Sequence, residues 1–446
     1  MPLCGGVLLL LGLTRPAIGS GPGRLLDWSL LACLLAIAAQ LIPLQASLRQ
    51  RLSPQALAID RIVALDAQPA VHRAHALSVD VESTIWALAL AGAYIGLFWC
   101  ARATFSRGGV RTTVRGVAWL GVGLTILVAV QRATSPALLY WTWRPISAGA
   151  SPYGPFVNRN ALASWLAMAV PLVIGYAIAR HQSRHGRSEH TIPGTSIDSV
   201  QLWLAGAVIL MTGGLLASMS RAGILGGGIG LISFIILARQ RIKSGRSVGW
   251  MLVGLVGLVA AASAYANLGT LALRLRETTE QGEWGRPAIW RDTWRMIANF
   301  PLTGVGAGGF QHAMLVYQQG SRLFFFNQAH NEYLQIVAEG GLLVAVPALT
   351  ALLAAVGLMA RSLGADRTPI FWIRAGAICG VVAVAVQGIW DTGLRTPANG
   401  VLCAVIAAIA MHQPRPASPH HSGHRPHTSP GGDGRGSPAL PASRAS

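Results

Sequence analysis

Charged residues are scarce in this chain of 446 amino acids. They make up 11% of the sequence, whereas apolar residues make up 52%. A water-soluble fold of this length needs far more charge on its surface, so the scarcity excludes an ordinary soluble protein. The composition therefore indicates a membrane protein.

Cysteine is scarce as well, with five residues in the whole chain. All five fall in or near apolar stretches, and the sequence has no Cys-x-x-Cys motif. This placement argues against a disulfide framework in an external loop and against a cysteine-based metal site. We expect the cysteines to behave as small apolar side chains.

The apolar residues come in separate blocks of the length that crosses a hydrocarbon core about 30 Å thick at about 1.5 Å per residue. We therefore expect an all-α, polytopic transmembrane helical bundle of about ten to twelve spans. The candidate spans are residues 25–44, 84–101, 116–131, 161–179, 200–218, 222–238, 249–266, 341–360, 372–390 and 399–411.

Both ends of the chain differ from this pattern. The apolar run 3–13 is short, lacks a preceding basic segment and fits a cleaved signal peptide poorly, so an interfacial or half-inserted helix and an eleventh span both stay open. From residue 413 onward the chain is rich in Pro, Ser, Gly, His and Arg, which is typical of a disordered tail. We thus expect an N-terminal segment 1–24, a membrane domain 25–412 and a cytoplasmic tail 413–446.

The net charge of +19 could suggest a nucleic-acid partner, but the positions of the basic residues indicate membrane orientation instead. Every second loop is basic, as the positive-inside rule requires if both termini are cytoplasmic. The basic residues of these loops are Arg102, Arg107, Arg111, Arg115, Arg180, Arg184, Arg187, Arg239, Arg241, Lys243, Arg246, Arg361 and Arg367. We expect no nucleic-acid partner.

Three external segments, 45–83, 132–160 and 268–340, are long enough to hold chemistry, and the last is the largest. Within it, Gly285 and Pro287 predict the start of an amphipathic helix that Pro301 stops. A second helix is predicted to begin near His330. The intervening glycines from Gly304 onward predict a close turn and not a dinucleotide fingerprint, because no strand precedes them.

Four strings in one order carry a family resemblance across residues 77–341. They are LSVDVEST, GPFVNRNALASWLA, SMSRAG, and GRPAIWRDTWRMIANFPLTGVGAGGF followed by AHNEYLQIVAEGG. Together they resemble the O-antigen ligase and polymerase family of membrane glycosyltransferases. The resemblance implies a bacterial inner-membrane enzyme whose active site faces the periplasm. Such an enzyme transfers a glycan from an undecaprenyl-diphosphate carrier to a lipid-linked, glycan-linked or protein acceptor. It is expected to need no metal or other cofactor.

The resemblance also implies roles for three residues. Arg221 and Arg286 match the arginines that hold the diphosphate, and His330 matches the histidine that activates the acceptor. Guanidinium chemistry agrees, since it binds two phosphate oxygens and keeps its proton. Arg291, on the same predicted helix as Arg286, is a further diphosphate candidate. For Arg221 the alternative is an arginine that only keeps a helical hairpin from sinking into the membrane.

Other polar residues keep two interpretations each. Asn158, Arg159 and Asn160 are candidates for contacts with sugar hydroxyls or phosphate, although Asn160 could equally cap the following helix. Asp80 and Glu82 could hold a metal or act as a base, or they could stabilise the start of the next span.

Our main prediction is thus an inverting, metal-independent ligase or polymerase. A protein O-oligosaccharyltransferase of the same superfamily is the alternative among enzymes. A transporter or flippase for lipid-linked sugars is the rival from another class, but it should place polar groups near mid-membrane, whereas here they gather in one external segment. Membrane lipids are expected partners in each case.

Overall fold

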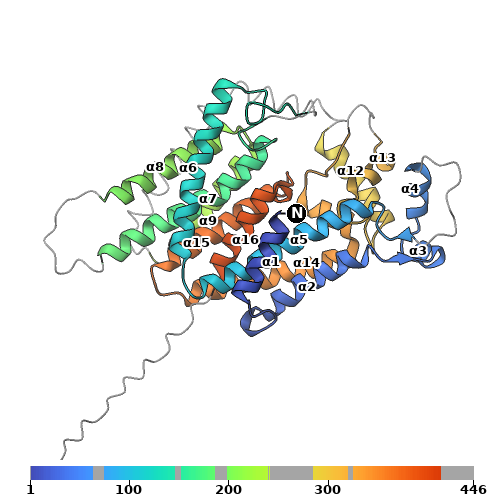
Figure 1. The fold of residues 1–446 in the computed structure, drawn as a ribbon, viewed down its shortest axis with the longest axis horizontal. Coiled ribbons are helices and arrows are strands. Elements are labelled where there is room, and N and C mark those ends of the chain that lie inside the picture. The colour runs from blue at the N-terminus through green and yellow to red at the C-terminus, as the bar shows by residue number, and fades with distance from the viewer. Residues whose placement is uncertain are drawn as a thin grey trace, which may run out of the picture. The chain divides into compact units, whose positions relative to one another are not determined.

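The computed structural model describes residues 2–63, 75–145, 152–185, 198–239, 241, 285–319 and 325–412. These residues form helices almost throughout (Figure 1), and their strands are limited to the short antiparallel pair β1 (Pro43–Leu44) and β2 (His75–Ala76). The predicted all-α polytopic bundle is confirmed. The predicted tail 413–446 lies outside the described residues.

Eight helices of the described part are long and apolar enough to cross a membrane. They are α2 (Arg24–Ala39, preceded by the short helix η1, Gly21–Gly23), α5 (Val81–Phe105), α6 (Val110–Thr134), α7 (Arg159–His185), α8 (Ser199–Ala217), α9 (Arg221–Ala238), α14 (Glu332–Ala365) and α15 (Ile370–Gln387). The last predicted span corresponds to the shorter helix α16 (Pro397–Met411). Each predicted span thus coincides with a helix except 249–266, which lies outside the described residues.

Two predicted spans are too long at their ends. The span 25–44 corresponds to α2, which ends at Ala39, because residues 43–44 pair instead with β2 and Pro43 cannot continue a helix. The span 372–390 corresponds to α15, which ends at Gln387. The residues after Gln387 lead into the short helix η2 (Gly393–Arg395).

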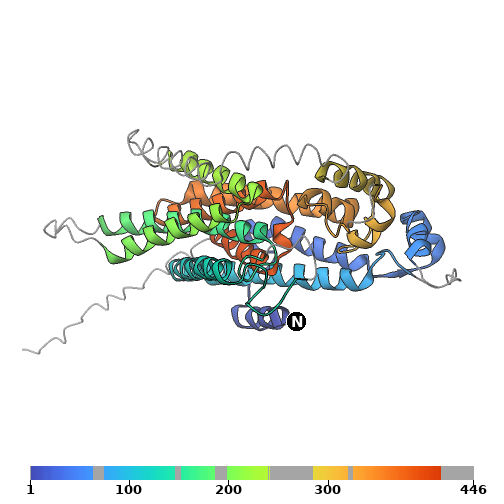
Figure 2. The same cartoon turned by 90° about the horizontal axis from the view of Figure 1, so that it is seen from above.

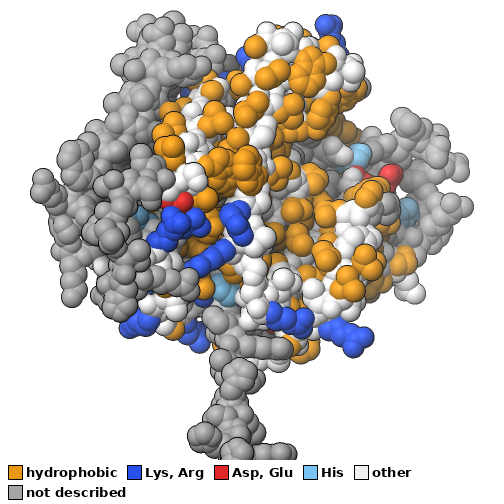
Figure 3. All heavy atoms as spheres, turned by 60° about the vertical axis from the view of Figure 1, so that its left-hand side comes forward, with side chains coloured by type: hydrophobic (Ala, Val, Ile, Leu, Met, Phe, Trp, Pro, Cys, Tyr) orange, Lys and Arg blue, Asp and Glu red, His pale blue; other side chains and the backbone are white. Residues whose placement is uncertain are grey.

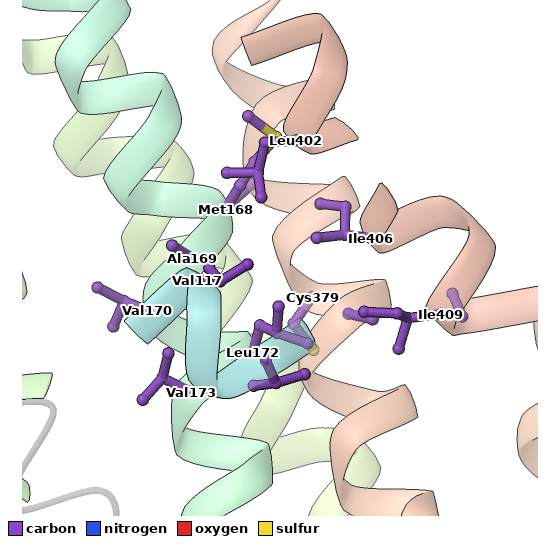
Figure 4. Close-up of a cluster of buried hydrophobic side chains, with 14 of the residues drawn as sticks. Val117, Met168, Ala169, Val170, Leu172, Val173, Cys379, Leu402, Ile406 and Ile409 are labelled. Atoms are coloured by element: carbon purple, nitrogen blue, oxygen red, sulfur yellow. The ribbon is translucent and has the colours of Figure 1, made fainter. Parts of the chain in front are cut away.

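Helix α15 packs against α7 and α9 through glycines. A Cβ atom added at Gly376 would lie 2.3 Å from the Pro171 carbonyl oxygen, and one added at Gly380 would lie 2.5 Å from the Met168 carbonyl oxygen. The two glycines are four residues apart, a spacing that lets membrane helices approach closely. Apolar side chains of α6, α7, α15 and α16 fill the surrounding core (Figure 4).

These contacts bring several helix ends together. α7 and α9 both run antiparallel to α15, because Gly175 of α7 meets Trp372 and Gly226 of α9 meets Ala383. The N-termini of α7 and α9 therefore lie beside the C-terminus of α15. The amide of Glu332, the first residue of α14, also donates to the Gly388 carbonyl oxygen at 2.8 Å. We call this end of the bundle the site end and the opposite end the basic end.

The basic end holds arginines that were predicted to be cytoplasmic. Arg180 and Arg184 both pair with Asp198, which caps α8, at 3.1 and 2.7 Å. Arg102 pairs with the buried Asp27 at 2.7 Å. Figure 3 brings forward the side on which α7 and α8 lie in Figure 1, and there Lys and Arg side chains gather mostly below a broad area of hydrophobic side chains.

The short helices lie outside the long ones. α1 (Pro2–Thr14) packs along α5 at the edge of the bundle (Figure 2), and its 13 residues span about 20 Å, less than a hydrocarbon core. Helices α3 (Ala46–Leu52), α4 (Ala56–Val63), α12 (Arg286–Asn299) and α13 (Phe310–Tyr317) lie together at one extremity of the bundle (Figure 1). α12 is the predicted amphipathic helix, with Ile289 and Met296 buried and Arg291 exposed.

Candidate functional site

Arg221 is the first residue of α9, at a sharp turn between α8 and α9. Met219 adopts a left-handed backbone with φ 53°, and Ser220 caps α9 by accepting a hydrogen bond from the Gly223 amide at 3.2 Å. Gly223 packs so closely on α7 that an added Cβ would lie 2.4 Å from the Ala163 Cβ. These contacts fix Arg221 at the site end, where its side chain is exposed.

Arg286 is likewise the first residue of its helix, α12, after Gly285 and before Pro287. Proline suits this position because the first amides of a helix have no partner within it. Burial is the main cause that lowers the pKa of the Arg286 guanidinium, and the positive charge of Arg221 lowers it further while Asp391 raises it. Arginine stays protonated despite such shifts. The electrostatic influence of Arg221 and Asp391 places both near Arg286.

His330 lies two residues before α14 and has a left-handed backbone with φ 50°. Such a conformation is uncommon outside glycine and marks a strained position held by its surroundings. Asn331 caps α14 through hydrogen bonds of 3.0 Å from the amides of Tyr333 and Leu334. The backbone on either side of His330 is therefore fixed, which sets the direction of its side chain.

A second helix holds the same segment from the other side. The indole of Trp290, on α12, donates to the Ala329 carbonyl oxygen at 2.9 Å, and the Ala329 amide donates to the Gln335 side chain at 2.5 Å. Because Trp290 is one turn after Arg286, α12 positions the guanidinium and the imidazole segment together.

Asp391 lies in the segment that follows α15 and joins Arg221, Arg286 and His330 at the site end. Its carboxylate is buried, and its Oδ1 lies 3.9 Å from Nδ1 of His330. That separation is longer than a hydrogen bond but keeps the carboxylate and the imidazole close to each other. A buried carboxylate requires charged or hydrogen-bonding neighbours, and His330 and Arg286 provide them. Asp391 thus links the histidine to the arginines.

The N-terminus of α7 borders this group. Asn158 accepts a hydrogen bond from the Asn160 amide at 2.9 Å, so Asn158 and not Asn160 caps the helix. The Asn160 carbonyl oxygen accepts from the Gln387 side chain at 3.1 Å, which ties α7 to the segment carrying Asp391. Arg159 is the first residue of α7, as Arg221 and Arg286 are of their helices.

The remaining candidates stand apart. Arg291 is exposed on α12, and among the described residues no ion pair joins it to Asp391. Asp80 caps α5 through the Ser83 amide at 3.0 Å and pairs with His312 at 2.7 Å, which fits the stabilising interpretation of this acidic pair. Within the described part of the chain, no group of three or more His, Cys, Asp or Glu is placed to hold a metal ion.

Sequence reasoning missed Asp391. It lies in the stretch Gln387–Gly388–Ile389–Trp390–Asp391–Thr392, where a lone acidic residue follows an apolar span that was predicted to continue to residue 390. An acidic residue at a membrane edge is a signal for function that could have singled it out. Nothing in the spacing shows that it approaches His330, 61 positions earlier.

Residues 206–349 match the family model described as O-antigen ligase. This part of the chain is therefore similar to the O-antigen ligase family. The match covers about a third of the sequence and includes Arg221, Arg286 and His330, whereas Asn158 and Asp391 lie outside it. A comparison with curated proteins finds no match. The matched stretch thus includes three of the four residues that meet at the site end.

Proposed function

We propose that this membrane enzyme of the O-antigen ligase and polymerase type transfers a glycan from an undecaprenyl-diphosphate carrier to an acceptor hydroxyl, with inversion and without a metal. The observation that carries the proposal is the grouping of Arg221, Arg286, His330 and Asp391 at one end of the helical bundle. Two permanent cations and a histidine–carboxylate pair are the groups that such a transfer needs.

The arginines serve the donor. As the bond between the sugar and the diphosphate breaks, negative charge grows on the diphosphate, and guanidinium groups stabilise it through paired hydrogen bonds. Arg221 and Arg286 begin their helices, so free backbone amides and the helix dipole add to the attraction for an anion. Arg159 begins α7 in the same way and supports a wider phosphate or sugar contact together with Asn158 and Asn160. Arg291 is a more peripheral diphosphate contact.

His330 serves the acceptor. Asp391 lies toward Nδ1, which favours the tautomer with a proton on that atom and leaves the Nε2 lone pair available. Nε2 accepts the proton of the acceptor hydroxyl while the hydroxyl oxygen bonds to the anomeric carbon and the diphosphate departs with the electrons of the broken bond. One such displacement inverts the anomeric centre. Asp391 then stabilises the imidazolium, and a nearby Arg286 keeps the donor in place.

The site end would face the periplasm of a bacterial inner membrane. The arginines at the basic end support this orientation through the positive-inside rule, and an undecaprenyl diphosphate presents its charged group at a membrane surface. The acceptor would be lipid- or glycan-linked, with a protein hydroxyl as the alternative.

The test is transfer by purified protein with a carrier-diphosphate glycan and acceptor. Arg286→Lys should lower kcat/KM at least about tenfold, since a point charge replaces a two-pronged donor. Arg295→Lys, on the same helix but paired with Asp292 at 3.5 Å, is the matched control and should stay near wild type. Equal activity of both variants would contradict the diphosphate role of Arg286. Movement of intact carrier-linked glycan across vesicles without transfer would instead support a flippase.

A further inference from the structure

A cavity of about 530 Å³ lies between α2, α5, α14 and α16. Its wall is apolar over most of its length, with Leu30 from α2, Phe98 from α5, Leu352 from α14 and Met411 from α16. On α16, lining residues recur from Gly400 to Met411, which corresponds to about 16 Å along the helix. The cavity is thus long and apolar, and its volume falls within the usual range of about 300–1,000 Å³ for ligand sites.

One end of the cavity is polar and acidic. Glu332, Glu339, Arg395 and Tyr94 line it there. Arg395 forms a two-pronged ion pair with Glu339, with Nη2–Oε2 at 2.6 Å and Nη1–Oε1 at 3.2 Å. Glu339 also accepts a hydrogen bond from Gln335 at 2.9 Å. The positive charge of Arg395 is therefore largely taken up by one of the two carboxylates.

Glu332 is the carboxylate that remains under-compensated. Its Oε1 lies 3.8 Å from Arg395 Nε, and among the described residues its Oε2 has no hydrogen-bond partner. The Tyr94 hydroxyl, in the same wall, also lacks one there. Buried polar atoms are normally paired, so unpaired atoms at the end of a cavity point to a ligand that supplies donors.

The sign of the charge distinguishes this cavity from the arginine group of the site end. Two acidic side chains face one guanidinium at this end of the cavity, and this balance disfavours a diphosphate or another anionic head group. It favours a cation that donates several hydrogen bonds. An ammonium group is such a cation, because it is positively charged and donates several hydrogen bonds.

We propose that this cavity binds a membrane lipid with an ammonium head group, which pairs with Glu332 at the polar end while its aliphatic chains fill the apolar length. Burial of the chains along α5, α14 and α16 supplies the main attraction, and Glu332 selects the head group. The polar end of this cavity borders the site end, since Glu332 is two residues from His330, but the proposal does not depend on the function proposed for the glycan site.

The experiment titrates delipidated full-length protein in detergent with palmitoyl-oleoyl phosphatidylethanolamine or phosphatidylglycerol and counts bound lipids by native mass spectrometry. Wild type should prefer the ethanolamine lipid. Ala355→Phe places a ring in the cavity and should weaken its binding at least about tenfold. Ala360→Phe makes the same change on an exposed position of α14 outside the cavity and is the matched control, with binding as in wild type.

Glu332→Gln keeps the size of the side chain and tests the head group alone. It should reduce the preference for phosphatidylethanolamine over phosphatidylglycerol about tenfold, because an ion pair becomes a neutral hydrogen bond. Equal binding of both lipids by wild type would overturn the proposal, and so would an unchanged preference in Glu332→Gln or full binding by Ala355→Phe. No glycan donor is present, so these outcomes leave the transferase proposal untouched.

Discussion

The sharpest prediction concerns His330, whose chemistry and backbone strain can be separated by two substitutions. His330→Ala removes the proposed base and keeps a Cβ at a position with φ 50°. His330→Gly removes the base and also the steric strain. Both variants should turn over at least about a hundred times more slowly than wild type, because general base catalysis is typically worth 10² to 10⁴. Donor binding should stay nearly normal in both, since His330 acts on the acceptor.

His330→Gly should be more stable than His330→Ala, although glycine usually lowers the free energy of unfolding relative to alanine. A left-handed backbone with a Cβ costs about 1–2 kcal/mol, whereas glycine costs about 0.4–1 kcal/mol through the freedom of the unfolded chain. The net advantage of His330→Gly over His330→Ala is then roughly 0.8 kcal/mol. The backbone around His330 is held by Trp290, Asn331 and Gln335, so neither variant should relax into another conformation.

Transfer assays and reversible unfolding in mixed micelles measure the two effects on the same preparations. His312→Ala is the matched control, because His312 is another histidine of the segment 268–340 but pairs with Asp80. It should retain turnover near wild type. If His330→Ala keeps wild-type turnover, or if it loses donor binding instead of turnover, His330 is not the base. A His330→Gly protein clearly less stable than His330→Ala would refute the strain argument.

Asp391→Asn should reduce kcat at least about tenfold with little change in KM for the donor, because the imidazolium loses its carboxylate, and an unchanged kcat would remove Asp391 from the site. Gly380→Leu should destabilise the bundle by about 1–3 kcal/mol in an unfolding experiment, since its Cβ would already lie 2.5 Å from the Met168 carbonyl oxygen. Gly213→Leu, which has open space around it, serves as the control and should unfold like wild type. A chelator should leave turnover unchanged, and a reproducible need for added divalent metal would contradict the metal-independent mechanism. A reporter fused after Arg322 should be periplasmic, and a cytoplasmic reporter there would reverse the proposed orientation.

The sequence by itself determined the spans and the residues at their starts. Apolar blocks have to match the thickness of a membrane, so they predicted the positions of α5 to α9, α14 and α15, although α14 begins at Glu332, well before the predicted span 341–360. Gly285, Pro287 and Pro301 act locally on the backbone, and they predicted α12 for that reason. Errors arose where pairing with a distant segment decided the outcome, as at residues 43–44, which pair with β2.

Only the tertiary structure decided which of these residues meet. Asp391 approaches His330 because α14 and α15 cross the bundle in opposite directions and return the chain to the same end, a result of helix packing that no local pattern encodes. The same packing through Gly376 and Gly380 aligns the starts of α7 and α9 with that end. The acidic cavity likewise depends on four helices from distant parts of the sequence. Hydropathy sets where each helix crosses the membrane, but close contact between helices sets which charges become neighbours.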